Sequence, residues 1–274
     1  MYPLVRGVLR FVDSERYTRS FGFQWNKHRR TQYDVGPMGA SETFLRGLGL
    51  TPNSVSGRTV LDAGCGAGRY SEVLARWGGR VIAMDLSSAV DACHENLGPR
   101  GVTVVQADLT RPPVAPESLD IVMSVGVLHH TPEARTSFAQ LARLVKPGGL
   151  MAVWLYDAYG DQTTRMKLSM LLRRVTRRLP PRFLYALCHL SVPWYHLNRT
   201  PVVRHVSARL WHISEHPWWR WRVLDTFDWY SPAFQSHHRY PEVAAWFAEC
   251  GFAGVTVAEP PVAVLGAKSA DPAS

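Results

Sequence analysis

The feature that most constrains this chain is a glycine-rich turn between a short apolar segment and a helical pattern. It occupies residues 59–76, with the sequence TVLDAGCGAGRYSEVLAR. Gly64, Gly66 and Gly68 carry no side chain where the backbone has to turn sharply. The helix expected after them presents unpaired N–H groups and the positive end of its dipole. The pattern therefore predicts a strand, a turn that holds a nucleoside-like ligand, and a helix.

The spacing of the glycines decides between ligands. A dinucleotide fingerprint is G-x-G-x-x-G, but here the third glycine comes one residue early and Arg69 stands in its place. A phosphate-binding loop needs a Lys after its last glycine, and none follows Gly68. What remains is D-x-G-x-G-x-G beginning at Asp62, which resembles motif I of the class I S-adenosylmethionine-dependent methyltransferases. A glycine turn in another kind of α/β protein is the alternative.

Acidic residues follow the next two expected strands. Asp85 ends the strand expected from residue 80 and lies 21 residues after Gly64, where a carboxylate meets ribose hydroxyls in a strand-helix-strand nucleoside site. Its alternative role is to cap the next helix. Asp108 follows a strand expected at 102–106. The resemblance implies that Asp108 contacts the adenine amino group; otherwise it is a turn residue.

The fourth expected strand, residues 119–125, is a continuous apolar run and leads into GVLHHTP. This stretch resembles motif IV of small-molecule methyltransferases. His129 is the histidine expected at the pocket, either as a general base or only as part of its wall, and His130 is expected to anchor the loop. A helix at 133–144, the turn KPGG and a fifth strand at 150–156 complete the resemblance.

The resemblance implies a Rossmann-like α/β fold, a seven-stranded sheet with helices on both faces. We expect the last helix at 241–250 and a closing hairpin from strands at 255–258 and 262–265. The predicted division of the chain is a cap at 1–57, a cofactor-binding core at 58–156, a helical lid insertion at 157–240, a core-completing helix and hairpin at 241–267, and a tail at 268–274.

The expected cap carries aromatic residues without a regular period, and its segment FGFQWN resembles one in a group of bacterial methyltransferases. Trp25 and Tyr33 either hold the sulfonium cation against their ring faces or cover apolar surface at the sheet edge. With them, the resemblance implies a set of cofactor-binding residues: Trp25, Tyr33, Asp62, Gly64, Cys65, Gly66, Gly68, Asp85, Leu86, Asp108, Leu109, Ser124 and Val125.

The insertion is basic. The net charge is +9, yet residues 162–214 contain no Asp or Glu and ten Lys or Arg. In residues 168–179 leucines and Val175 share one helical face and four arginines the other, so we expect an amphipathic helix with a basic outer side. Three interpretations remain: a solvated face on a lid helix, a peripheral contact of residues 165–178 with a membrane or an anionic substrate, or a nucleic-acid surface, which the lack of basic residues along the core disfavours.

The end of the insertion is rich in tryptophan, with polar side chains between the rings. Such a run lines a substrate pocket or packs the lid onto the sheet. We predict that Asp228, Tyr230 and His238 face the substrate and, with His129, form the catalytic set. His237 and His238 are not part of an H-x-x-x-H motif and have no carboxylate at a spacing that would complete a coordination sphere, so no metal site is expected.

The composition indicates what core the chain can form and in which compartment it is expected. At 274 residues and 46% hydrophobic content, the chain is long enough for a packed core. Its four cysteines form no C-x-x-C pair, which argues against zinc and disulfides and favours a reducing compartment. Neither a signal peptide nor an apolar stretch of ~20 residues is evident, so a cytoplasmic protein is expected.

The predicted function is methyl transfer from S-adenosylmethionine to an O, N or C atom of a small molecule, for example in natural-product or glycan biosynthesis. The chain has no N-P-P-Y or Pro-Cys motif after the fourth strand, which disfavours nucleic-acid bases as acceptors. Two alternatives remain open. S-adenosylmethionine could itself be the substrate, through aminocarboxypropyl transfer or cyclisation, or the chain could be a non-catalytic cofactor-binding or membrane-docked module. The oligomeric state is not predicted.

Overall fold

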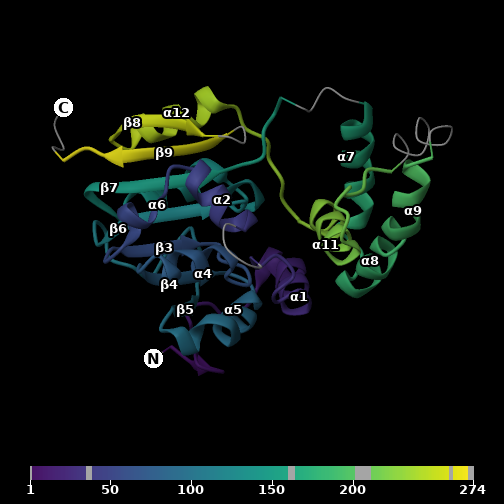
Figure 1. Ribbon diagram of the computed structural model, residues 1–274, viewed down its shortest axis with the longest axis horizontal. Helices are drawn as coiled ribbons and strands as arrows, with labels where there is room; N and C mark the ends of the chain where they lie inside the picture. The colour runs from purple at the N-terminus through teal and green to yellow at the C-terminus, as the bar shows by residue number, and fades with distance from the viewer. Residues whose placement is uncertain (1, 35–38, 160–163, 201–210, 259–261, 271–274) are drawn as a thin grey trace.

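The computed structural model describes residues 2–34, 39–159, 164–200, 211–258 and 262–270 as an α/β sheet with a separate helical layer at one end (Figure 1). This confirms the predicted fold class. The sheet has nine strands in the order β1-β2-β5-β4-β3-β6-β7-β9-β8. Their bounds are β1 Leu4–Val5, β2 Val8–Arg10, β3 Thr59–Ala63, β4 Arg80–Asp85, β5 Thr103–Gln106, β6 Leu119–Val125, β7 Val145–Trp154, β8 Phe252–Ala258 and β9 Ala263–Lys268.

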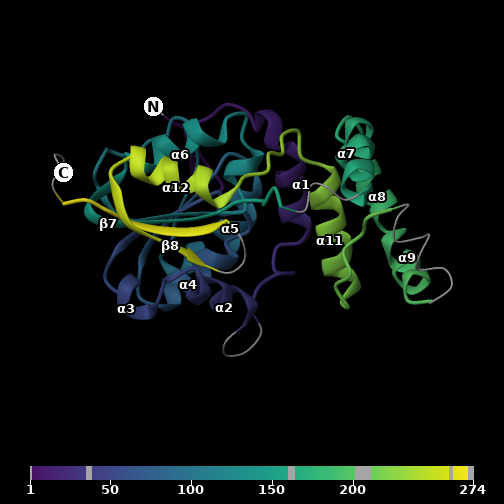
Figure 2. The same ribbon diagram turned by 90° about the horizontal axis from the view of Figure 1, so that it is seen from above.

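Helices cover both faces of the sheet (Figure 2). One face carries α2 (Ala40–Gly47), α3 (Pro52–Val55), α4 (Arg69–Arg76) and α5 (Ala89–Leu97), whose apolar side chains pack with those of β3 and β4. The other face carries α6 (Ala134–Ala142) and α12 (Tyr240–Glu249), which contribute Phe138 and Phe247. Strands buried on both faces are apolar throughout, which is why their positions could be predicted from continuous runs.

Two strands were not predicted, and both lie in the segment expected to be only a cap. β1 and β2 form a hairpin, and β2 pairs in parallel with β5 through Leu9 and Val105. They are two and three residues long, too short for an alternating pattern to be visible in the sequence. The seven-stranded expectation is thereby corrected to nine.

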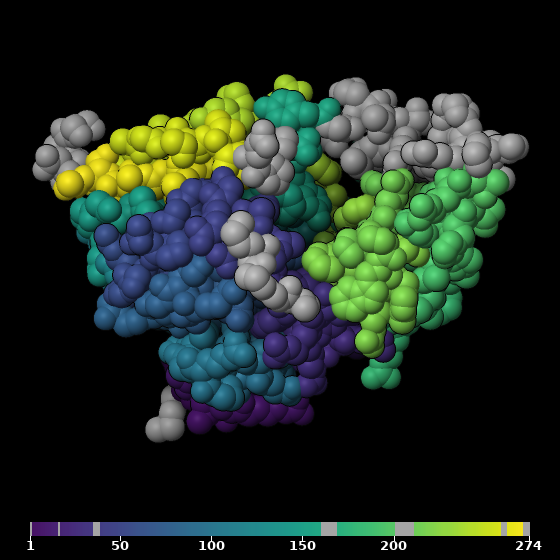
Figure 3. Space-filling view, viewed as in Figure 1, coloured from purple at the N-terminus to yellow at the C-terminus, as the bar shows by residue number. Residues whose placement is uncertain are grey.

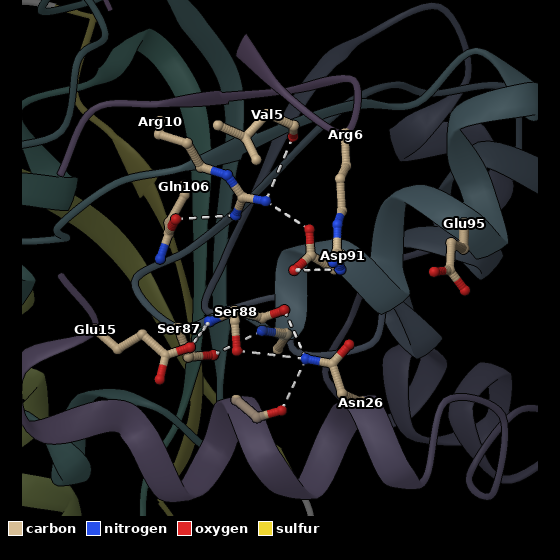
Figure 4. A network of polar contacts seen from close by, with 12 residues as sticks. Val5, Arg6, Arg10, Glu15, Asn26, Ser87, Ser88, Asp91, Glu95 and Gln106 are labelled. Atoms are coloured by element: carbon tan, nitrogen blue, oxygen red, sulfur yellow. Dashed lines mark hydrogen bonds and ion pairs between the residues drawn. The ribbon is translucent and has the colours of Figure 1, made fainter. Parts of the chain in front are cut away.

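A buried arginine fixes the hairpin. Arg10 is 8% exposed; its guanidinium donates to Gln106 Oε1 at 2.9 Å on β5 and to Asp91 Oδ1 at 2.5 Å on α5 (Figure 4). A charged donor bonded to a carboxylate makes a strong hydrogen bond when both are shielded from water. Arg10 therefore ties the edge of the sheet to the helix that covers it.

The helix α1 (Arg19–Lys27) stands between the sheet and the helical layer, and it is preceded by the short η1 (Arg16–Thr18). Asn26 Nδ2 donates to the Ser88 carbonyl oxygen at 2.8 Å, and Glu15 Oε1 accepts from the Ser88 N–H at 2.7 Å (Figure 4). Gly22 permits this approach, since a Cβ there would lie 2.5 Å from Ser88 Oγ. These contacts hold α1 directly beside the loop that follows Asp85.

The segment expected as a lid insertion leaves and rejoins the core at one place. Asp157 and His238 form an isolated parallel bridge, and the His238 N–H donates to the Tyr156 carbonyl oxygen at 2.8 Å. Between them lie α7 (Thr164–Thr176), α8 (Pro181–Cys188), α9 (Ser191–Asn198) and α11 (Trp219–Tyr230). α7, α8 and α9 pack on α11, and α11 packs on α1. Residues 201–210 and 271–274 of the expected insertion and tail lie outside the described residues.

Arg10→Met tests whether Arg10 fixes the hairpin. We expect it to lower the free energy of unfolding by about 2 kcal/mol, because Gln106 and Asp91 lose a charged donor in a buried setting. Arg6→Met is the matched control, since Arg6 approaches the same Asp91 at 3.9 Å but is 77% exposed in its side chain. Its effect should stay within ~0.5 kcal/mol in urea unfolding. Equal losses for the two variants would contradict the assignment.

Candidate functional site

The glycine turn wraps around the carboxyl end of β4. The N–H groups of Gly64 and Cys65 donate to the Met84 carbonyl oxygen at 2.7 and 3.0 Å. The N–H of Gly66 donates to Asp85 Oδ2 at 3.0 Å. Gly64 and Gly66 have φ angles of +88° and +53°, which residues with a Cβ rarely adopt. The turn and the Asp85 carboxylate therefore form one unit.

The close packing over this turn explains its glycines. A Cβ on Gly64 would lie 2.3 Å from a methyl group of Val127, and one on Gly66 would lie 3.1 Å from Trp25 Nε1. The Trp25 indole thus rests against the turn. The Tyr33 hydroxyl donates to the Ala67 carbonyl oxygen at 2.7 Å, which fastens the segment after α1 to the same loop.

A cavity of about 410 Å³ lies at the carboxyl ends of β4, β3, β6 and β7 and is closed on its far side by α11. This is the edge where ligands bind in open α/β sheets, at the point where the strand order reverses. The structure brings ten of the predicted site residues to its wall: Trp25, Tyr33, Gly64, Cys65, Gly66, Asp85, Leu86, Leu109, Val125 and Asp228.

Four predicted cofactor residues lie behind the wall rather than in it. Asp62 Oδ2 accepts from Ser71 Oγ at 2.6 Å, and the Ser124 hydroxyl donates to the Ala63 carbonyl oxygen at 2.9 Å. Asp108 Oδ1 accepts from the N–H and hydroxyl of Thr110 and shapes a turn. Gly68 begins α4 in the left-handed conformation. These residues hold the wall in place, and the structure does not bring them to the cavity.

Burial sets the charge of the two core carboxyls. It raises the pKa of Asp62 to about 6, against the opposing hydrogen bond from Ser71. Burial also raises the pKa of Asp85, while N–H and hydroxyl donors on Ser87 and Gly66 act in the opposite direction. Oδ1 of Asp85 accepts from both the N–H and the hydroxyl of Ser87, whereas Oδ2 accepts from the Gly66 N–H and keeps a lone pair for a ligand hydroxyl.

The two histidines exchange the places expected from the sequence. His129 is fully buried: Tyr156 stacks on its ring at 3.9 Å, the Tyr156 N–H donates to its Nδ1 at 3.2 Å, and its Nε2 has no partner among the described residues. His130 lines the cavity instead. Sequence adjacency could not show which ring turns inward, because the 3-10 turn of residues 128–130 decides it.

The tautomer of His130 follows from its partner. Its Nδ1 lies 3.0 Å from the carbonyl oxygen of Phe234, which can only accept, so Nδ1 carries the proton and Nε2 is the acceptor of the neutral ring. Burial lowers the pKa of His130, and that of His129 further. His130 is therefore a neutral imidazole at pH 7.

Tyr230 and His238, predicted to face the substrate, have structural contacts instead. The Tyr230 hydroxyl donates to the His212 carbonyl oxygen at 2.9 Å, and its ring packs with α8. His238 bonds Ser236 and Glu242 at 2.8 and 2.9 Å, at the base of the insertion. Neither is among the described residues that line the cavity. Of the predicted catalytic set, Asp228 alone is among the described residues that line the cavity.

One face of α11 forms the far wall. Trp221, Asp225, Asp228 and Trp229 all line the cavity, at the spacing of a single helical face. Val223 and Phe227 on the opposite face pack against α8. Of the four, only Asp228 was predicted as a site residue, although the i, i+4, i+7, i+8 pattern is visible in the sequence.

Polar contacts join this wall to α1 and to β7. Asp228 accepts from Gln24 Nε2 at 2.8 Å and from the Tyr156 hydroxyl at 3.3 Å. Burial, followed by the nearby Asp228, raises the pKa of Tyr156 well above its usual value, so its phenol keeps its proton. Gln24 lies in the FGFQWN segment, but neither it nor Tyr156 was predicted as a site residue.

A second chain of contacts reaches the glycine turn. Asp225 Oδ1 accepts from Gln32 Nε2 at 3.3 Å, and Gln32 Oε1 accepts from Arg69 Nη1 at 2.8 Å. Arg69 directly follows Gly68 at the start of α4. The residue that departs from the dinucleotide pattern thus links the turn to the helix that closes the cavity.

Comparison with known proteins agrees with this geometry. Residues 61–153 match the family described as methyltransferase domain. The ubiquinone biosynthesis O-methyltransferase of Methylococcus capsulatus is 34% identical over 104 residues, which cover 35% of this chain and 42% of that protein. The enzyme of the same description from Pseudomonas paraeruginosa is 36% identical over 101 residues, covering 35% and 43%. The chain thus matches less than half the length of these relatives.

Solved structures extend the likeness to most of the chain. A putative S-adenosylmethionine-dependent methyltransferase from Methanococcus maripaludis aligns over 95% of this chain and 96% of its own, with 14% identity and a TM-score of 0.50. An O-methyltransferase family protein from Burkholderia thailandensis aligns over 90% and 58%, with 20% identity and a TM-score of 0.51. At such identities the likeness is one of fold. Residues 61–153 therefore match the methyltransferase domain family, and the chain shares its fold with solved proteins described as an S-adenosylmethionine-dependent methyltransferase and an O-methyltransferase.

Proposed function

We propose that this protein transfers the methyl group of S-adenosylmethionine to a small molecule held between the sheet and α11. The observation that carries the proposal is the cavity, which joins the glycine turn and Asp85 on one side to the face of α11 on the other. Its volume, about 410 Å³, lies in the range of small-molecule sites. The curated relatives are named for O-methylation in ubiquinone biosynthesis, which supports a small acceptor.

The residues at the turn fit the cofactor. Gly66 lets the Trp25 indole rest against the turn, and Asp85 offers its Oδ2 at the end of β4, where ribose hydroxyls are bound in such folds. Trp25 and Tyr33 supply ring faces that suit a sulfonium cation. When bound, S-adenosylmethionine supplies an electrophilic methyl group. The nine predicted cofactor residues on the wall keep that role as a proposal.

The remaining wall residues position the acceptor. Trp221 and Trp229 of α11 exclude water from the far side, and positioning of this kind contributes much of the rate in a group transfer. His130 Nε2 is the free acceptor of a neutral ring, and we assign it, in place of His129, the removal of a proton from the acceptor where one must leave. Asp228 bonds the acceptor or orients Tyr156 toward it.

The insertion, proposed as residues 157–240, supplies the acceptor side, and residues 58–156 bind the cofactor. We propose peripheral contact of residues 165–178 with a membrane or another anionic surface, on the strength of the basic charge gathered there. A nucleic-acid partner is not proposed. A cytoplasmic location is also a proposal, which the four free thiols suit. No helix in the described ranges is both long enough and apolar enough to cross a bilayer.

The reaction can be tested by its nucleoside product. The protein is incubated with S-adenosylmethionine and a panel of phenols, amines and sugar derivatives, and the products are separated by chromatography. We expect acceptor-dependent S-adenosylhomocysteine. Accumulation of methylthioadenosine would show that the aminocarboxypropyl group reacts instead, and the absence of any cofactor binding by calorimetry would end the enzymatic proposal.

Asp85→Asn tests the cofactor side. We expect the affinity for S-adenosylhomocysteine to fall at least about tenfold in calorimetry, because hydrogen bonds to a charged group are lost. Asp120→Asn is the matched control. Asp120 begins β6 at the opposite edge of the sheet and bonds the Thr59 N–H and Lys146, so its change should leave the affinity within about twofold. Unchanged binding by the Asp85 variant would refute the assigned role.

Asp225→Asn tests the protonation state of Asp225 in the far wall of the cavity. Burial, with the neighbouring Asp228, raises the pKa of Asp225 to about 7. Between pH 4 and 7 the folded state therefore keeps a proton that the unfolded state releases, and this group lowers stability as the pH rises. The free energy of unfolding of the variant should exceed that of the wild type by about 1–2 kcal/mol at pH 8 and should differ little from it at pH 4. A difference of the same size at both pH values would contradict this.

A further inference from the structure

The helix α7 packs differently from the sequence prediction, which placed the four arginines outside and the apolar side chains inside: Arg173 turns toward the end of α11, while Leu171 and Val175 are exposed. Arg173 Nη2 donates to the Pro232 carbonyl oxygen at 2.9 Å, and Thr176 Oγ1 donates to the Tyr230 carbonyl oxygen at 2.9 Å. Ser169, one turn earlier, is buried. The packed face of α7 is thus polar, and backbone carbonyl groups after α11 explain why: they need donors, which leucines cannot supply.

The opposite face of α7 is apolar and exposed. Leu171 is 55% exposed and Val175 is 62% exposed. Arg174 and Arg178 are exposed beside them. An isolated surface leucine needs no explanation, but a helix that exposes its apolar side chains while polar ones make its packing contacts does.

The helix α8 repeats the arrangement. Leu184 and Tyr185 are buried in the cluster that α8 shares with α11. Phe183 and Leu187 are exposed four residues apart on one side of α8, and Leu190, two residues after the helix ends, is exposed as well. Each of the two helices therefore packs on α11 with one face and shows an apolar strip on another.

These strips lie in the outer layer of the molecule. α7, α8 and α9 lie on the side of α11 away from the sheet (Figures 1 and 2), and all three contact α11. The space-filling view shows the same layer as a lobe beside the sheet (Figure 3). Among the described residues, 11 of the 17 large exposed apolar side chains belong to residues 164–234, so the exposure is concentrated there.

The charge around the apolar strips indicates what kind of partner they bind. Arg174, Arg178 and Arg182 are exposed in this layer, and residues 162–214 contain no acidic side chain to offset them. Two copies facing each other would bring like charges together. A phosphate backbone would satisfy the arginines but leave the apolar strips in water. A bilayer with anionic headgroups satisfies both, since acyl chains take up the apolar side chains and lipid phosphates pair with the arginines.

We propose that α7 and α8 dock the protein on an anionic lipid bilayer, with Leu171, Val175, Phe183 and Leu187 entering the interface and the arginines contacting headgroups. α7 has 13 residues, fewer than the ~20 that span a bilayer, so it lies in the interface plane. The inference is independent of methyl transfer, because vesicle binding and cofactor binding are separate measurements.

The test is co-sedimentation of the full chain with vesicles of phosphatidylcholine alone or with about 30% phosphatidylglycerol, at low and high salt. We expect binding to the anionic vesicles that weakens as salt rises. Leu171→Ser with Val175→Ser should reduce the partition about tenfold or more, because two apolar side chains no longer enter the interface. Arg174→Gln with Arg178→Gln should weaken anionic binding and flatten its salt dependence.

Val257→Ser is the matched control, since Val257 is equally exposed but lies on β8, outside the insertion. It should bind vesicles as wild type does. Calorimetry with S-adenosylhomocysteine on every variant reports whether the core remains folded and ligand-competent. Equal binding to both kinds of vesicle, retention of binding by the Leu171 and Val175 double variant, concentration-dependent self-association without vesicle binding, or binding to RNA alone would each overturn the proposal.

Discussion

The hydrogen bond from the Gly66 N–H to the Asp85 carboxylate is the contact on which the rest of the site depends. It closes the turn after β3 onto the end of β4, and it does so only because Gly64 and Gly66 adopt positive φ angles. The same carboxylate accepts from the N–H and hydroxyl of Ser87 at 2.8 and 2.7 Å. A buried charge with several donors is held in one orientation, so two strands, a turn and the start of α5 share one fixed point.

From this point outward, polar contacts connect one layer to the next. Ser88, directly after Ser87, is hydrogen-bonded to Asn26 on α1 and to Glu15, which precedes that helix. The end of α1 reaches the outer layer through His28, whose Nε2 lies 2.9 Å from the Tyr185 hydroxyl. Burial, reinforced by Arg220 and Lys27, lowers the pKa of His28 to about 4, so this junction is uncharged at neutral pH. The junction between α1 and the outer layer is therefore a neutral polar contact between otherwise apolar layers.

The parallel core could be predicted because each of its strands is buried on both faces. β6 has the predicted bounds, and α12 differs from its prediction by one residue at each end. The edges could not be predicted in this way. β1 and β2 are held by Arg10, a single side chain whose partners lie 81 and 96 residues away, and no local pattern contains that information.

Within the site, sequence reasoning found the residues that belong to motifs and missed those that meet only in the fold. Gln24, Gln32 and Tyr156 lie outside the glycine turn and the other strand-end motifs, and only the fold brings them to the cavity that α11 closes. The packing of α7 shows the same limit. A helical period separates two faces, but it does not say which one is packed. Here the carbonyl groups of Tyr230 and Pro232 accept hydrogen bonds from Thr176 and Arg173, because burying those carbonyl groups without donors is costly.

The helix α11 packs on two sides. Its face with Asp225 and Asp228 forms the wall of the cavity, while Val223 and Phe227 on the other side support α8. Two helix layers, α11 and then α7 with α8, separate the cavity from the apolar strips. α11 therefore belongs both to the cavity wall and to the packing of the outer layer, whereas the Asp85 end of the cavity is held by the glycine turn and Ser87.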